Sequence, residues 1–168
     1  YLADLLKNLC EEVYISCRAD QQKATDSKYP TLADTFTGLG PYGAILSAFR
    51  EKPGVAWLVV ACDLPLLDME TLRYLKDHRN ISSIATTFES PFNSLPEPLI
   101  TIWEPRSYPV LLSFLSQGYS CPVKALRNND TTVLTTYNPE ALTNVNTQEE
   151  LEKAQKLLQK KLPMNDAT

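Results

Sequence analysis

A carboxylate follows directly after a buried-strand pattern in the middle of the chain. Residues 57 to 65 read WLVVACDLP, in which six apolar residues precede Asp63 and Pro65 stops the strand from continuing. In open α/β sheets the ligand lies beyond the carboxyl ends of the strands. A lone carboxylate there can hold Mg²⁺, which keeps several waters and takes one or two carboxylates plus substrate phosphates. Asp63 is therefore a candidate catalytic and metal-binding residue; alternatively, it only begins the turn before Asp68.

A glycine-rich segment, GLGPYGA at residues 38 to 44, is the second stretch that could do chemistry. Glycines around Pro41 at the start of a helical pattern let the backbone approach a ligand closely and direct its amides at an anion. Glycine clusters also precede helices that bind nothing. The segment by itself therefore leaves both interpretations open.

Composition limits the classes of partner. The 168 residues are 43% hydrophobic, which is enough for a core, and we predict a single domain over residues 1–168. A formal charge of −4 with scattered Lys and Arg argues against a nucleic-acid or anionic-membrane binder. No apolar run approaches the roughly 20 residues that a membrane span requires. We therefore expect no nucleic-acid and no membrane partner.

The cysteines indicate the compartment. Cys10, Cys17, Cys62 and Cys121 lie far apart without a CxxC pair, and His78 is the only histidine, which argues against a zinc site. We predict that the cysteines are reduced and mostly buried. The expected location is the cytoplasm.

The elements that must position these residues alternate between strands and helices. We predict helices that start near Leu2, near Pro41, after Asp68, after Ser120 and after Thr147, where Thr147 and Glu150 form a capping box. A further predicted helix carries residues 110–115 and ends at Gly118. We predict strands over residues 13–17, 57–62, 84–88, 99–103 and 131–137, and an irregular connection over 31–39. This alternation predicts a three-layer α/β domain with a mainly parallel sheet.

Three segments, taken in order, resemble one family. GPYGAILSAF at 40–49, VVACDLP at 59–65 and NVNTQEELEKA at 144–154 are similar to the molybdenum cofactor guanylyltransferases. This family belongs to the NTP-transferase superfamily, which has a Rossmann-like sheet. Sister nucleotidyltransferases share the C-D-x-P element alone, whereas the three segments in this order are more specific.

The resemblance implies a reaction and a set of site residues. Members of the family transfer GMP from GTP to the terminal phosphate of molybdopterin and release pyrophosphate. Asp63 matches the family's Mg²⁺-binding aspartate. The implied nucleotide contacts are Ser16, Asp34, Gly40, Pro41, Gly43 and Asp63, and the implied molybdopterin contacts are Asn144 and Asn146. Further implied partners are other proteins of the molybdenum cofactor pathway, in transient contact.

The chain also departs from the family pattern. Ala44 stands where the family usually has its second glycine, and Gln148 replaces the usual proline. The family's opening strand, its glycine-rich loop and a phosphate-binding lysine do not occur. We expect these parts ahead of Tyr1 in the encoded protein, an inactive chain without them, and a gap in the sheet or an exposed central face.

Two other functions remain open at the level of sequence. One is a sister nucleotidyltransferase that uses CTP or another phosphorylated acceptor. The other is a non-catalytic nucleotide-binding or regulatory domain with the same fold.

Overall fold

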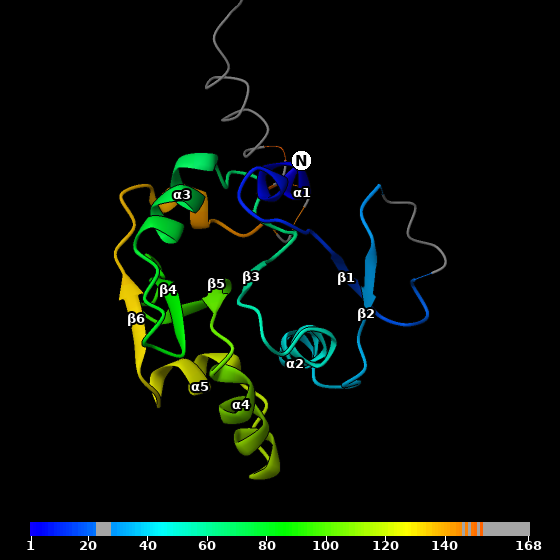
Figure 1. The fold of residues 1–168 in the computed structure, drawn as a ribbon. Helices are drawn as coiled ribbons and strands as arrows, with labels where there is room; N and C mark the ends of the chain where they lie inside the picture. Colours follow the sequence, from blue (N-terminus) through cyan, green and yellow to red (C-terminus); the bar gives the residue numbers. More distant parts are fainter. Residues whose placement is uncertain (23–27, 146, 148, 151, 153–168) are drawn as a thin grey trace, which may run out of the picture.

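The computed structural model describes residues 1–22, 28–145, 147, 149–150 and 152. Helices and strands alternate along most of this length (Figure 1). The elements are α1 (Leu2–Lys7), β1 (Ile15–Cys17), β2 (Thr31–Ala33), α2 (Pro41–Glu51), β3 (Trp57–Val60), α3 (Met69–Asp77), β4 (Ala85–Glu89), β5 (Pro96–Trp103), α4 (Ser107–Ser116), α5 (Pro122–Arg127), β6 (Thr131–Leu134) and the 3₁₀ helix η1 (Pro139–Leu142).

The strands form two sheets. β1 and β2 pair in parallel, and the second sheet has the order β3-β5-β4-β6. In the second sheet β6 runs parallel to β4, whereas β5 runs antiparallel to both β3 and β4. β3, β4 and β6 therefore share one direction. The predicted α/β fold is confirmed, with β5 as a reversed strand that makes the sheet mixed.

Helices cover both faces of the four-stranded sheet, which gives three layers (Figure 1). One hydrophobic cluster joins α2, α4 and α5 to one face, and a second joins α1, α3 and η1 to the other. Trp103 belongs to the first cluster and its neighbour Ile102 to the second. This follows from the alternation of side chains along a strand. Both clusters thus use the same strands.

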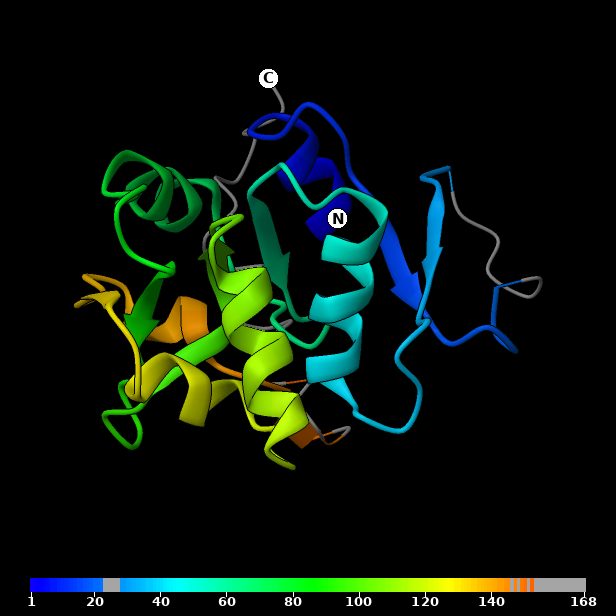
Figure 2. The same cartoon turned by 60° about the horizontal axis from the view of Figure 1, so that its bottom comes forward.

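The two sheets are separated by a gap. Figure 2 shows β1, β2 and β3 pointing in the same direction, with β1 between β2 and β3. Ile15 donates its N–H to Pro30 next to β2, and Ala61 donates its N–H to Leu99 next to β5. Because backbone groups alternate in direction along a strand, those of Ser16 in β1 and Leu58 in β3 face the space between the sheets. The predicted gap is confirmed.

Side chains bridge the amino-terminal end of this gap. The rings of Tyr14 and Trp57 lie 5.8 Å apart, and Lys52 Nζ lies 2.6 Å from both carboxylate oxygens of Glu12. A cavity of about 440 Å³ opens here, and Val13, Tyr14, Trp57 and Leu58 are among its lining residues. The two sheets are therefore joined by side-chain contacts at this end.

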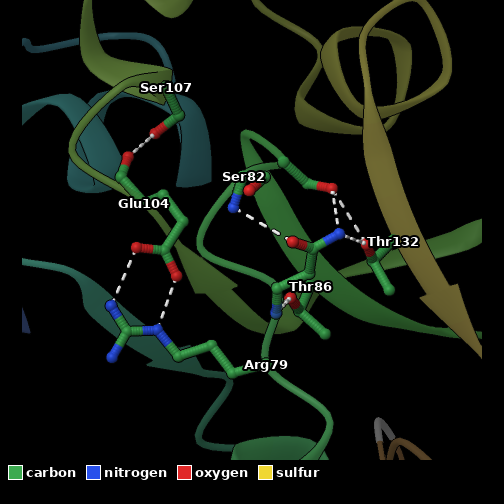
Figure 3. Close-up of polar contacts among 8 residues, drawn as sticks. Arg79, Ser82, Thr86, Glu104, Ser107 and Thr132 are labelled. Atoms are coloured by element: carbon green, nitrogen blue, oxygen red, sulfur yellow. Dashed lines mark hydrogen bonds and ion pairs between the residues drawn. The ribbon is translucent and has the colours of Figure 1, made fainter.

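A polar network ties α3 to the strands that follow it (Figure 3). Arg79 donates from Nε and Nη2 to the two carboxylate oxygens of Glu104, at 2.6 and 2.8 Å. The Glu104 side chain is 3% exposed, so the carboxylate of this bidentate pair is buried. Next to it, the Asn80 amide group donates to Ser83 and Thr132, which links β6 to the turn before β4. The network fixes the end of α3 over the sheet.

Local sequence signals explain two helix starts. Asp68 accepts a hydrogen bond from the Thr71 N–H at 2.8 Å and caps α3, as predicted. Thr147 and Glu150 exchange side-chain to backbone hydrogen bonds of 3.0 and 3.2 Å, which confirms the capping box. Most of the helix expected after it lies outside the described residues.

Two expectations are wrong. Residues 31–33 form strand β2 in place of an irregular connection, because Thr31 and Ala33 pair with β1 across the intervening loop. The four cysteines are free, but Cys62 and Cys121 are exposed and Cys10 and Cys17 only partly buried, so they are not core residues.

Within the described residues, no helix is long and apolar enough to cross a bilayer.

Candidate functional site

The candidate residues gather at one edge of the molecule. β1, β2 and β3 all end there, and α2 begins at the same edge because β2 leads into it through residues 34–40 (Figure 2). Asp34 follows β2 directly, and Asp63 follows β3 after two residues. The edge is formed by the carboxyl ends of parallel strands, where α/β proteins bind ligands.

Asp63 has an unusual environment. Its Oδ1 atom is shielded from solvent and has no hydrogen-bond partner within the described part of the chain. A buried carboxylate oxygen left unpaired costs free energy, so it is expected to have a partner in the working protein. A cation satisfies such an oxygen, and the donor type suits Mg²⁺.

Within the described residues, Asp63 belongs to no cluster of metal-ligating side chains. The described residues contain no group of three or more His, Cys, Asp or Glu side chains that could hold an ion. A bound Mg²⁺ would therefore complete its shell with water and substrate oxygens, which is its common mode of binding. The residues fit a metal that arrives together with a phosphate ligand.

The C-terminal segment reaches Asp63 through the backbone. The N–H of Val145 donates to the carbonyl oxygen of Asp63 at 2.9 Å. Asn144, the residue before it, is exposed. The structure thus brings one of the two predicted asparagines next to the predicted metal residue, while Asn146 lies outside the described residues.

Ser16 and Asp34 are in direct contact. Ser16 Oγ donates to Asp34 Oδ1 at 3.1 Å, and the Asp34 N–H donates to the Cys17 carbonyl at 2.9 Å. The contact follows from the parallel pairing of β1 with β2, because Ser16 lies opposite Leu32 and Asp34 follows Leu32 by two residues on the same face. These two predicted nucleotide contacts therefore form one polar pair.

The N-terminus of α2 is open to a ligand. Gly40 precedes the helix with φ 54° and ψ −138°, a conformation that requires glycine, and Pro41 occupies the first turn. No side chain caps this end and the first turn carries no acidic residue. Gly43 and Ala44 donate their N–H groups to the Gly40 carbonyl, so it is the dipole of this 11-residue helix that favours an anion at this point.

The residues after Pro41 face inward. Gly43 is buried, and a Cβ atom placed on it would lie 2.1 Å from the carbonyl oxygen of Phe36. Tyr42 is also buried and donates its hydroxyl to the Leu111 carbonyl of α4 at 2.8 Å. Burial raises the pKa of Tyr42 to about 12. Both residues hold α2 in place, and a nucleotide contact by Gly43 stays a prediction.

Two contacts of this edge have no local sequence signal. Ser47, buried in α2, accepts hydrogen bonds from the loop that carries Asp34. The bond from Val145 to Asp63 joins residues that lie far apart in the sequence. Neither residue type nor spacing indicates such contacts, because they depend on the folded chain.

Solved structures share the arrangement of layers and strands. Molybdopterin-guanine dinucleotide biosynthesis protein A from Archaeoglobus fulgidus superposes with a TM-score of 0.74 over 95% of this chain and 86% of its own, at 19% identity. A protein from Aquifex aeolicus VF5 also gives a TM-score of 0.74, over 88% of this chain and 77% of its own, at 18% identity. The chain therefore shares the fold of these two proteins.

The family is shown at the level of sequence. The model of the MobA-like NTP transferase domain matches residues 1–132, and the chain belongs to this family. A molybdenum cofactor biosynthesis bifunctional protein of Synechocystis is 32% identical over 151 residues, which are 89% of this chain and 44% of that protein. A probable molybdenum cofactor guanylyltransferase of Bacillus subtilis is 34% identical over 85 residues, which are 51% of this chain and 42% of that protein. The chain thus spans less than half the length of these two relatives.

Proposed function

We propose that the protein transfers GMP from GTP to molybdopterin. A terminal phosphate oxygen of molybdopterin forms a bond to the α-phosphorus of GTP, and the bond from this phosphorus to the bridging oxygen of the β-phosphate breaks. Pyrophosphate leaves with the electron pair of that bond. The acceptor phosphate is the nucleophile, so the chain's tasks are positioning and charge neutralisation. Membership of the MobA-like NTP transferase family supports this reaction.

The observation that carries the proposal is the buried, unpaired Oδ1 of Asp63 at the carboxyl end of β3. In the proposed site Asp63 binds Mg²⁺, which supplies positive charge beside the phosphates of the nucleotide. The Val145 N–H donates to the backbone carbonyl of Asp63, which fixes the main chain from which the carboxylate extends.

The other candidate residues at this edge bind different parts of the two substrates. Ser16 and Asp34 bind the nucleotide as a polar pair, and Gly40 and Pro41 present the start of α2 to its phosphates. Asn144 and Asn146 bind the pterin or its phosphate. Since Val145 lies between these asparagines and is bonded to Asp63, acceptor and nucleotide would meet at Asp63.

The proposal extends to the setting of the reaction. Both hydrophobic clusters use strands of one sheet, which supports a single nucleotidyltransferase-like domain over residues 1–168. The free cysteines fit a reducing compartment, and we place the protein in the cytoplasm. We expect it to receive and release the cofactor through transient contacts with other pathway proteins.

A transfer assay on the whole encoded protein tests the reaction. Pyrophosphate release is measured with GTP, CTP or ATP, with and without Mg²⁺, and with and without molybdopterin. Thermal unfolding is followed under the same conditions, because a ligand that binds the native state raises the unfolding temperature. We expect release only with GTP, Mg²⁺ and molybdopterin together. Release with CTP in place of GTP would favour a sister enzyme, and a thermal shift without any release would favour a non-catalytic binding domain.

A further inference from the structure

The loop between β2 and α2, residues 34–39, is attached to the start of α2 by an unusually close contact. The carbonyl oxygen of Phe36 lies against Gly43, at a place where a Cβ atom would be only 2.1 Å away. Gly54 is a useful comparison, because a Cβ atom added there would meet nothing within 4 Å. Position 43 therefore has room only for glycine, and any side chain there would displace the loop backbone.

Ser47, one turn further along α2, completes the attachment. Its Oγ accepts the backbone N–H of Thr35 at 2.8 Å and of Phe36 at 3.3 Å, and its own hydroxyl donates to the Gly43 carbonyl at 2.7 Å. A serine hydroxyl has one donor and two acceptor lone pairs, so all three are used. The side chain is buried, with 2% of the residue exposed, which protects these bonds from water.

These contacts fix the residue that the proposed function assigns to the nucleotide. Asp34 immediately precedes Thr35, and its carboxylate accepts from Ser16. The loop is bonded to β1 before Asp34 and to α2 after it, since the Asp34 N–H donates to Cys17 and the next two N–H groups donate to Ser47. Asp34 thus has a defined position relative to both β1 and α2.

We propose that Ser47 and Gly43 are positioning residues that set the affinity for the nucleotide through the loop of residues 34–39. The inference rests on the proposed function, because it takes Asp34 and Ser16 as nucleotide contacts. Ser47 lies inside α2 and touches the loop, so it acts on the substrate only through Asp34. Removal of its hydroxyl leaves the Thr35 and Phe36 N–H groups without their acceptor, and the loop loses its fixed position.

The test compares Ser47→Ala, Ser47→Thr and Gly43→Ala in the whole encoded protein. We expect Ser47→Ala to raise the KM for GTP on the order of tenfold while kcat changes less, because a lost loop position weakens binding of substrate and transition state alike. Hydrogen exchange of the Thr35 and Phe36 amides, followed by NMR, should become faster by a similar factor. Ser47→Thr keeps the hydroxyl and should restore both readouts. Gly43→Ala should reproduce the effects with Ser47 intact.

Matched controls separate this role from a general loss of stability. Ser116→Ala removes a hydroxyl that also donates to a carbonyl of its own helix, that of Ser113, but accepts no loop amide. Gly54→Ala adds a methyl group in open space. Both controls should leave the KM for GTP and the two amides unchanged.

The outcomes distinguish the positioning role from the function on which it rests. If the wild-type protein transfers no GMP, the proposed function fails and the positioning role fails with it. If the wild type is active and Ser47→Ala keeps its KM and its amide protection, only the positioning role is overturned. Should Ser47→Ala not fold, a Gly43→Ala protein with wild-type KM and wild-type amide exchange would overturn it equally.

Discussion

The backbone N–H of Val145 donates to the carbonyl oxygen of Asp63 at 2.9 Å. This bond connects the segment that carries Asn144 to the turn that follows β3, across about half the length of the chain. It also leaves the carboxylate of Asp63 free for a ligand, because only the main-chain oxygen is used. The proposed metal residue and the proposed acceptor segment are therefore one structural unit.

Asp63→Asn should remove most of the transferase activity and leave the protein folded. The amide keeps the shape of the side chain but loses the negative charge that would hold the metal beside the phosphates. We expect a loss on the order of 10²-fold or more, as for other electrostatic stabilisers of a transition state. The measurement is the rate of pyrophosphate release, together with the thermal unfolding temperature.

The control for this variant is Asp130→Asn, at an exposed carboxylate in the turn before β6. It should keep wild-type activity. Wild-type turnover by Asp63→Asn would show that the carboxylate only begins a turn.

Changing both Asn144 and Asn146 to alanine should impair molybdopterin use more than GTP affinity. The two amides are proposed to donate and accept hydrogen bonds with the pterin or its phosphate. We expect a higher KM for molybdopterin, on the order of tenfold, from the loss of two hydrogen-bonding groups. The rate is measured against molybdopterin concentration, and GTP binding is measured separately.

Asn93→Ala is the control for this pair. Asn93 Oδ1 accepts the Leu95 N–H within an exposed turn, which is the ordinary structural role of an asparagine. A collapse of GTP binding in the double variant would assign the pair to the nucleotide site. If neither measurement changes, the two asparagines serve only as turn residues.

Arg79→Met should destabilise the fold by about 2 kcal/mol, because it leaves the buried Glu104 carboxylate without its partner. The effect is smaller than for a fully buried pair, since the Arg79 side chain is 38% exposed. The exposed pair between Arg18 and Asp20 provides the control, and Arg18→Met should leave the stability nearly unchanged. Denaturant unfolding measures both, and equal effects would show that burial of Glu104 does not matter.

Tyr42→Phe should make the protein less sensitive to alkaline pH. Burial raises the pKa of Tyr42 to about 12, above the value of about 10 in an unfolded chain. The unfolded state therefore loses this proton first, so the contribution is fully present below pH 10 and is lost as the pH rises to about 12. The Tyr42→Phe protein has no hydroxyl to titrate, so its stability does not fall for this reason as the pH rises. It does lose the hydrogen bond to Leu111, which is worth about 1 kcal/mol at neutral pH.

The free energy of unfolding of both proteins, measured from pH 8 to pH 12, tests this. Tyr119→Phe removes a hydroxyl from an exposed ring and serves as the control. If the difference between wild type and Tyr42→Phe stays constant above pH 10, the Tyr42 hydroxyl does not contribute to the alkaline loss.

The helices and the longer strands could be predicted from the sequence because their signals are local. The Asp68 cap and the capping box of Thr147 and Glu150 are recognisable from spacing alone, and both are confirmed. Strand β2 was missed because its three residues carry too short a pattern, and its pairing with β1 depends on contacts across the chain. The reversed direction of β5 is likewise a property of the assembled sheet.

For the candidate site, the sequence indicates which residues to consider, and their roles stay predictions. Asp63 could be singled out because a carboxylate after an apolar run is a conflict within the local pattern, although β3 itself is only partly buried. The contact between Ser16 and Asp34 follows once β1 and β2 are paired in register, which requires the folded chain. Ser47 could not be found, since a serine within an apolar helix face gives no sign that a loop will bond to it.

The gap between β1 and β3 has a consequence for how the chain behaves in solution. The strand edges on either side carry backbone donors and acceptors, at Ser16 and at Leu58, that no strand of the described residues pairs with. Open edges of this kind recruit extended segments of other molecules and promote aggregation. This chain should therefore associate as its concentration rises, and light scattering would record this before any loss of helix content.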